Sequence, residues 1–118
     1  MTISNDQRVS MYRELVRCRE LEKGIVGFND YFHSAIGEDA VPVGSAFGLR
    51  PDDIYSPHYR GALMANAVRG ASLRRLIACV KGKETAYDRG HFFSEIRGRV
   101  DQNNLGVMGG ALAVSLTY

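Results

Sequence analysis

The segment SNDQRVSMYRELVRCRELEKGIV, residues 4–26, decides the fold class of this chain. Ser4 and Gln7 stand three positions apart at its start, which is the spacing of a capping box that satisfies unpaired N–H groups of a first helical turn. Its apolar residues recur at steps of three and four, with charged residues between them, as in an amphipathic helix. These apolar residues are Met11, Leu15, Cys18, Leu21 and Ile25, followed by Phe28. We therefore predict a long helix over about residues 6–26.

Three shorter helices are predicted after the long one. The first covers about residues 36–49, and it tolerates Pro42 only in its first turn, where a proline removes at most one hydrogen bond. The other two cover about residues 61–68 and 72–82, where apolar residues again recur at helical steps and glycines follow. Residues 54–55 could start a short strand, which the next proline must end or hold at an edge.

The rest of the chain shows no helical period. Residues 83–104 mix glycines, aromatic residues and charges, and we predict an irregular loop there. Residues 105–118 form an apolar segment, which must be covered by the domain itself, by another subunit or by further chain. The 118 residues, 45% of them hydrophobic, suffice for one compact domain. We predict a single, mainly α domain with about four helices and at most one or two short strands.

The charge distribution differs between the two halves of the chain. Residues 1–59 carry 6 basic and 9 acidic side chains, whereas residues 60–118 carry 9 basic and 4 acidic ones. The second half could face an anion or an acidic partner, although a solvated helix face is the simpler interpretation of such a charge run. No motif of a known nucleic-acid reader accompanies the basic residues, so we expect no nucleic-acid partner.

The remaining composition indicates a cytoplasmic location. Arginines interrupt the first apolar run, which argues against a signal peptide, and no stretch has the length of a membrane span. Cys18 and Cys79 lie inside helical patterns without metal-ligand spacing. We expect both to be buried, apolar residues in a reducing compartment.

The stretch SPHYRG, residues 56–61, is the strongest candidate for a binding site. Tyr59, Arg60 and Gly61 stand before a predicted helix, and so combine a phenol hydroxyl, a permanent cation and the N–H groups of a helix start. These groups suit a diphosphate. The tripeptide is common by chance, so its weight depends on the motifs around it.

Seven short motifs follow one another over nearly the whole chain. They are Met11-Tyr12-Arg13, residues 17–22, IGEDAVPVG at 36–44, LRPDD at 49–53, Tyr59-Arg60-Gly61, residues 76–83 with the ending Gly82-Lys83, and GVMGG at 106–110. In order and spacing they resemble the alpha subunit of thiamine diphosphate-dependent 2-oxo acid dehydrogenases, the family of the pyruvate, branched-chain and acetoin enzymes. The resemblance covers the amino-terminal part of that subunit, so it implies an incomplete version of the thiamine diphosphate-binding α/β fold.

The resemblance implies roles for individual residues. Tyr59 and Arg60 match the pair that binds the cofactor diphosphate in the family. Gly106 and Met108 lie in the segment that holds the aminopyrimidine ring through its backbone. His33 matches a histidine at the active-site entrance, and His91 stands where the family has a loop that carries a catalytic histidine.

Several departures count against a working site. The family continues its Tyr-Arg-Gly motif with histidine, where this chain has Ala62, and the surroundings of His91 do not match the family loop. The Gly-Asp-Gly motif that holds magnesium in the family would lie beyond Tyr118. Because magnesium needs oxygen ligands placed around the diphosphate, we expect no metal site and no cofactor in these residues alone. Thiamine diphosphate with magnesium would require completion by a partner chain.

Each candidate residue also has a structural interpretation. Arg60 could form a salt bridge, and His33 could end a helix or lie at an interface. His58 and His91 could be solvated loop residues. The glycines from Gly106 to Gly110 could serve close packing.

Three functional hypotheses remain open. The favoured one is a truncated, non-catalytic relative that forms a homo-oligomer or binds a protein partner or a small anion. The second is the amino-terminal part of a split 2-oxo acid dehydrogenase, completed by another polypeptide. The third is a gene fragment without independent function.

Overall fold

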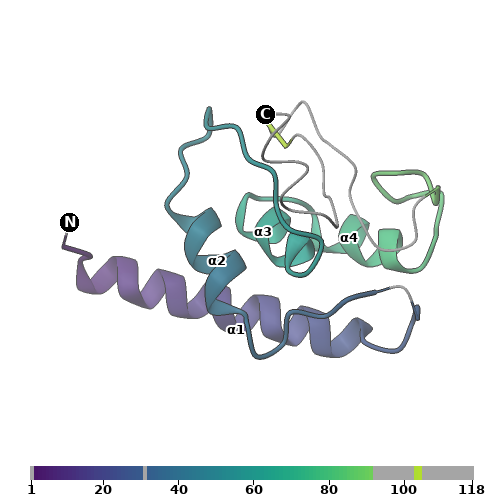
Figure 1. The fold of residues 1–118 in the computed structure, drawn as a ribbon, viewed down its shortest axis with the longest axis horizontal. Helices are drawn as coiled ribbons and strands as arrows, with labels where there is room; N and C mark the ends of the chain where they lie inside the picture. Colours follow the sequence, from purple (N-terminus) through teal and green to yellow (C-terminus); the bar gives the residue numbers. More distant parts are fainter. Residues whose placement is uncertain (1, 31, 92–102, 105–118) are drawn as a thin grey trace.

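The computed structural model describes residues 2–30, 32–91 and 103–104 (Figure 1). Within these residues the chain forms helices and no strand, which confirms the predicted mainly helical class. The helices are α1 (Asn5–Ile25), α2 (Ala40–Phe47), α3 (Ala62–Val68) and α4 (Leu73–Val80). In Figure 1 the long α1 runs along one side of the molecule, and the shorter helices lie over it.

Helix α1 begins as the sequence predicts. The Ser4 hydroxyl accepts a hydrogen bond from the Gln7 backbone N–H at 3.2 Å, and the Ser4 N–H donates to Gln7 Oε1 at 2.9 Å. This capping box satisfies N–H groups that a first turn leaves without helical partners. Phe28 departs from the prediction, because it lies beyond the end of α1 at Ile25 and its side chain is 51% exposed. The helical period no longer applies there.

Helix α2 is shorter than predicted. It starts at Ala40 rather than at Ile36, because Gly37 adopts a φ of +97° that a right-handed helix does not allow. Pro42 falls in the first turn, as its missing N–H requires.

Helices α2 and α3 pack closely at the start of α3. Gly61 precedes α3 with a φ of +96°, and a Cβ at this position would lie 2.8 Å from Pro42 Cβ. Only a residue without a side chain fits this contact and this backbone conformation at once. The contact therefore fixes where the chain enters α3, directly after Tyr59 and Arg60.

The core lies where α1, α3 and α4 meet. Small and medium apolar side chains dominate it, and Met64 and Leu76 are fully buried at its centre. Cys18 and Cys79 are buried and free, as predicted. Burial raises the pKa of the Cys18 thiol to about 11, so this thiol stays protonated at neutral pH and behaves as an apolar group.

The predicted short strand at residues 54–55 reduces to a single parallel bridge between Tyr55 and Asn104. The Tyr55 N–H donates to the Asn103 carbonyl at 3.0 Å. The buried Asn66 side chain accepts hydrogen bonds from the Tyr55 hydroxyl at 2.7 Å and from Asn104 Nδ2 at 2.8 Å. Asn66 on α3 therefore joins residues 103–104 to the segment before the site.

Candidate functional site

Four side chains gather in front of α3, and we call them the Tyr59 cluster: His33, His58, Tyr59 and Arg60. The His33 ring lies edge-on to Tyr59, with ring centroids 5.0 Å apart and planes at 88°. The His58 ring lies 4.2 Å from Tyr59 on centroids, and the Arg60 guanidinium carbon lies 6.0 Å from the Tyr59 ring centroid. The fold thus brings together two predicted site residues that are 26 positions apart, His33 and Tyr59.

Hydrogen bonds to backbone groups hold this cluster. Arg60 Nη1 donates to the Ser34 carbonyl at 3.3 Å, and the Arg60 N–H donates to His58 Nδ1 at 3.2 Å. Among the ion pairs of the described residues none includes Arg60, so the salt bridge considered from the sequence is not found there. In the part of the chain that the structure describes, the exposed guanidinium is thus not paired with a carboxylate.

The cluster has the chemistry of an anion site. A guanidinium offers several N–H donors in a planar fork that suits phosphate and carboxylate oxygens. The phenol hydroxyl and the two imidazoles beside it can donate further hydrogen bonds. The four side chains belong to two parts of the chain, residue 33 and residues 58–60, and both must be held in place for the donors to converge.

The start of α3 contributes less than the sequence suggested. The helix has seven residues, and Gly61, Ala62 and Leu63 at its start are buried against the fold. A short helix with a covered first turn offers few backbone donors to a ligand in solvent. We therefore assign the anion-binding capacity to the side chains of the Tyr59 cluster.

The other predicted site residues are not part of this cluster as described. His91 lies in the turn after α4, where its N–H donates to the Asp88 carbonyl at 3.1 Å. Gly106 and Met108 lie outside the described residues, so their role in holding an aminopyrimidine ring stays a prediction.

Sequence reasoning missed a buried carboxylate, Glu22, behind the cluster. Its side chain is fully buried on α1, and its Oε2 accepts hydrogen bonds from the Ser34 hydroxyl and the Ala35 N–H, both at 2.7 Å. Burial raises the pKa of Glu22, and these hydrogen bonds oppose that rise. The signal was present, because Glu22 stands four residues after Cys18 and hence on the buried face of α1.

Asp39, directly before α2, is the second buried carboxylate. It does occupy the N-cap position, but its side chain makes no capping hydrogen bond. Instead Asp39 Oδ2 accepts from Arg19 Nη2 at 2.6 Å, and from the Gly37 N–H at 3.2 Å. The hydrogen bond from Arg19 lowers the pKa of Asp39, so this carboxylate stays ionised.

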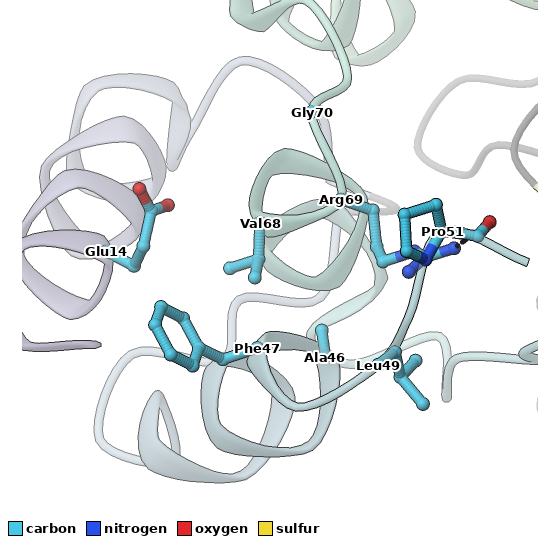
Figure 2. Close-up of a pocket in the computed structure, with 8 residues that line it drawn as sticks. All are labelled: Glu14, Ala46, Phe47, Leu49, Pro51, Val68, Arg69 and Gly70. Atoms are coloured by element: carbon cyan, nitrogen blue, oxygen red, sulfur yellow. Dashed lines mark hydrogen bonds between the residues drawn. The ribbon is translucent and has the colours of Figure 1, made fainter. Parts of the chain in front are cut away.

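A separate cavity of about 530 Å³ lies between α1, α2 and the end of α3 (Figure 2). Figure 2 shows Phe47 and Val68 in its middle, with Glu14 on one side and Arg69 with Pro51 on the other. Arg69 donates to the Arg50 carbonyl at 2.6 Å and to the Pro51 carbonyl at 3.1 Å. Arg69 thus connects the turn at residues 50–51 to the end of α3 by hydrogen bonds. None of the residues that line the cavity belongs to the Tyr59 cluster.

The described residues contain neither a candidate metal-binding group nor a candidate membrane-spanning helix. No group of three or more histidine, cysteine, aspartate or glutamate side chains there could hold a metal ion. No helix of this part of the chain is long and apolar enough to cross a membrane.

The family model for the dehydrogenase E1 component matches residues 8–117. The chain therefore belongs to the dehydrogenase E1 component family, and the resemblance to E1-type 2-oxo acid dehydrogenases is confirmed. Enzymes of this family depend in general on thiamine diphosphate. Neither the curated proteins nor the solved structures contain a match to the chain.

Proposed function

We propose that the 118 residues by themselves form a non-catalytic E1-type domain that holds a small anion at the Tyr59 cluster. The observation that carries this proposal is the position of Arg60. Its guanidinium is fixed on the Ser34 carbonyl beside a phenol and two imidazoles, and no carboxylate of the described residues pairs with it. A diphosphate is the ligand that both this chemistry and the family favour.

The same cluster argues against catalysis by these residues alone. Magnesium bound to a diphosphate takes its protein ligands from carboxylate, amide and carbonyl oxygens. The cluster offers donors and no carboxylate, and the 118-residue sequence has no Gly-Asp-Gly motif. We therefore expect an anion to bind weakly here, with an affinity that falls as salt increases.

A titration tests this proposal. The full chain is titrated with inorganic pyrophosphate and with thiamine diphosphate, each with and without magnesium, by isothermal calorimetry. We expect pyrophosphate to bind and Arg60→Met to abolish binding. Arg74→Met is the matched control, because it removes an equally exposed arginine from α4, away from the cluster. Equal effects of the two variants would refute the site, and a tight magnesium-dependent thiamine diphosphate complex with turnover would refute the non-catalytic role.

We further propose that the domain forms a homo-oligomer. E1 components generally form oligomers, and α1 presents an exposed apolar stripe here. Val9, Tyr12 and Val16 stand at helical steps of three and four and are 49%, 67% and 43% exposed. A second copy that packs on this stripe would remove it from water. Light scattering of the wild type and of Tyr12→Glu tests this, and a monomeric wild type would refute it.

A split enzyme is the alternative, and the match of the E1 family model to residues 8–117 supports it. A second polypeptide would bring the magnesium-binding motif, and a beta subunit would complete the site. The reaction would then be oxidative decarboxylation of a 2-oxo acid with acyl transfer to lipoamide. Co-purification of the chain with such a polypeptide, and activity of the mixture, would favour this alternative over the non-catalytic role.

A further inference from the structure

Glu22 connects the core of the molecule to the Tyr59 cluster. We propose that Glu22 is a positioning residue for the anion site: it fixes residues 33–35, and these in turn fix Tyr59 and Arg60. This inference rests on the proposed anion-binding function. It adds a residue that lies behind the site and touches no ligand.

The first step is the contact between α1 and Ser34–Ala35. Glu22 Oε2 accepts from the Ser34 hydroxyl and from the Ala35 N–H, both at 2.7 Å. The Ser34 hydroxyl also accepts from the Ile36 N–H at 3.1 Å. One buried oxygen therefore holds a side chain and a backbone group of the same short segment. Because hydrogen bonds to an ionised or buried carboxylate are strong, this segment has little freedom to move against α1.

The second step runs from this segment to the cluster. Arg60 Nη1 donates to the carbonyl of Ser34, the residue whose hydroxyl is bound to Glu22. The preceding residue, His33, sets its ring edge-on against Tyr59. The Ser34 carbonyl contacts Arg60, and the His33 ring contacts Tyr59. Both contacts therefore come from Ser34, which Glu22 binds, or from the residue directly before it.

The third step uses the packing on the other side of the segment. Ala35 is buried, and its Cβ would lie 3.6 Å from a Cβ placed at Gly61. Ala35 therefore lies between α1 and the start of α3, while His33 before it is exposed. If Glu22 released the segment, the shift would reach Tyr59 and Arg60, which directly precede Gly61.

Burying a carboxylate is costly, and one oxygen of Glu22 has no hydrogen-bond partner among the described residues. An apolar residue would serve packing at this position better than Glu22 does. The two hydrogen bonds of Glu22 therefore point to a role in orienting the segment in addition to stability. Asp39 offers a comparison, because it is also buried but its carboxylate accepts hydrogen bonds from Arg19 and Gly37 rather than from Ser34 and Ala35.

The test uses the full chain, inorganic pyrophosphate as the probe, and three variants. Glu22→Gln keeps an acceptor for both hydrogen bonds, and we expect a dissociation constant within about twofold of wild type. Glu22→Ala removes the acceptor, and we expect about tenfold weaker binding, equivalent to about 1.4 kcal/mol. Asp39→Asn is the matched control, with a lower melting temperature but a dissociation constant within about twofold of wild type.

If Glu22→Ala does not fold, Ser34→Ala replaces it. We expect Ser34→Ala to weaken pyrophosphate binding about threefold, because it removes one of the two hydrogen bonds to Glu22.

A second readout separates positioning from simple stability. Because the His33 and Tyr59 ring centroids lie 5.0 Å apart, we expect a ring-current shift on the imidazole C–H signals of His33, which NMR can detect without any ligand. We expect this shift to diminish in Glu22→Ala and to persist in Glu22→Gln and Asp39→Asn. Unchanged affinity and an unchanged His33 signal in folded Glu22→Ala or Ser34→Ala would overturn the inference, as would equal weakening in Asp39→Asn. A wild type that binds no pyrophosphate would instead refute the anion site, while the His33 signal still decides whether Glu22 positions the segment.

Discussion

Helix α1 meets the rest of the molecule through two different surfaces. Toward α3 and α4 it presents apolar residues such as Cys18 and Ile25, which belong to the same buried cluster as Met64 and Leu76. Toward residues 33–39 it presents Glu22 and Arg19, which form hydrogen bonds and an ion pair. The apolar surface excludes water in any well-packed arrangement, whereas the polar surface requires particular atoms to meet. The first therefore supplies stability, and the second sets the orientation of the segment behind the Tyr59 cluster.

The largest change in the free energy of unfolding is expected from a substitution in the apolar surface. Met64→Ala removes a fully buried side chain from α3, and the cavity left behind should reduce the free energy of unfolding by about 3 kcal/mol. Urea denaturation followed by circular dichroism measures this loss. Val41→Ala is the control, since Val41 is 71% exposed on α2 and should change stability very little. Similar losses in both variants would contradict the assigned core.

A smaller effect is expected from Asp39→Asn on the polar surface. The change weakens the hydrogen bond from Arg19 and should cost about 2 kcal/mol at neutral pH. The pKa of Asp39 is lowered in the folded protein, so its contribution is present above its ordinary value of 3.8 and is lost as pH falls below that value. Denaturation curves between pH 2 and 7 should show this loss in the wild type and not in the variant.

Glu22→Gln should give a still smaller change with the opposite pH dependence. The pKa of Glu22 is raised by burial, so the wild type should lose stability as pH rises above the ordinary value of 4.5. Gln does not ionise, and the variant should lack this decline, with a difference within about 1 kcal/mol at pH 4. The same denaturation series measures it. A decline of equal slope in both proteins would exclude Glu22 as its source.

The smallest effect is expected from an exposed polar contact. Lys23 Nζ lies 2.8 Å from Glu20 Oε1 on the solvent side of α1, and both side chains are more than half exposed. Lys23→Ala should change the free energy of unfolding by less than about 0.5 kcal/mol, because water screens such pairs. If Lys23→Ala lowered the free energy of unfolding as much as Asp39→Asn does, the exposed and the buried ion pairs of α1 would contribute equally to stability, contrary to this prediction.

The sequence predicted α1 well, because a capping box and a helical apolar period are local properties. It placed the start of α2 too early, because the turn at Gly37 depends on a positive φ that no period reveals. His33 and Tyr59 were connected through the family resemblance, and the fold then brought their rings together. The domain boundary, the cytoplasmic location and the roles of Gly106 and Met108 stay predictions.

By itself the sequence determined the helical class, the capped long helix, the buried cysteines and the E1 family, since each depends on residue type and spacing. Only the tertiary structure decided which charged residues are buried and what they hold. In the sequence Glu22 does not differ from the other charged residues of α1. It accepts hydrogen bonds from Ser34 and Ala35 only when residues 34–35 fold against α1. Hydrogen bonds between segments far apart in sequence depend on where the packed backbone places each donor and acceptor, and residue spacing does not carry that information.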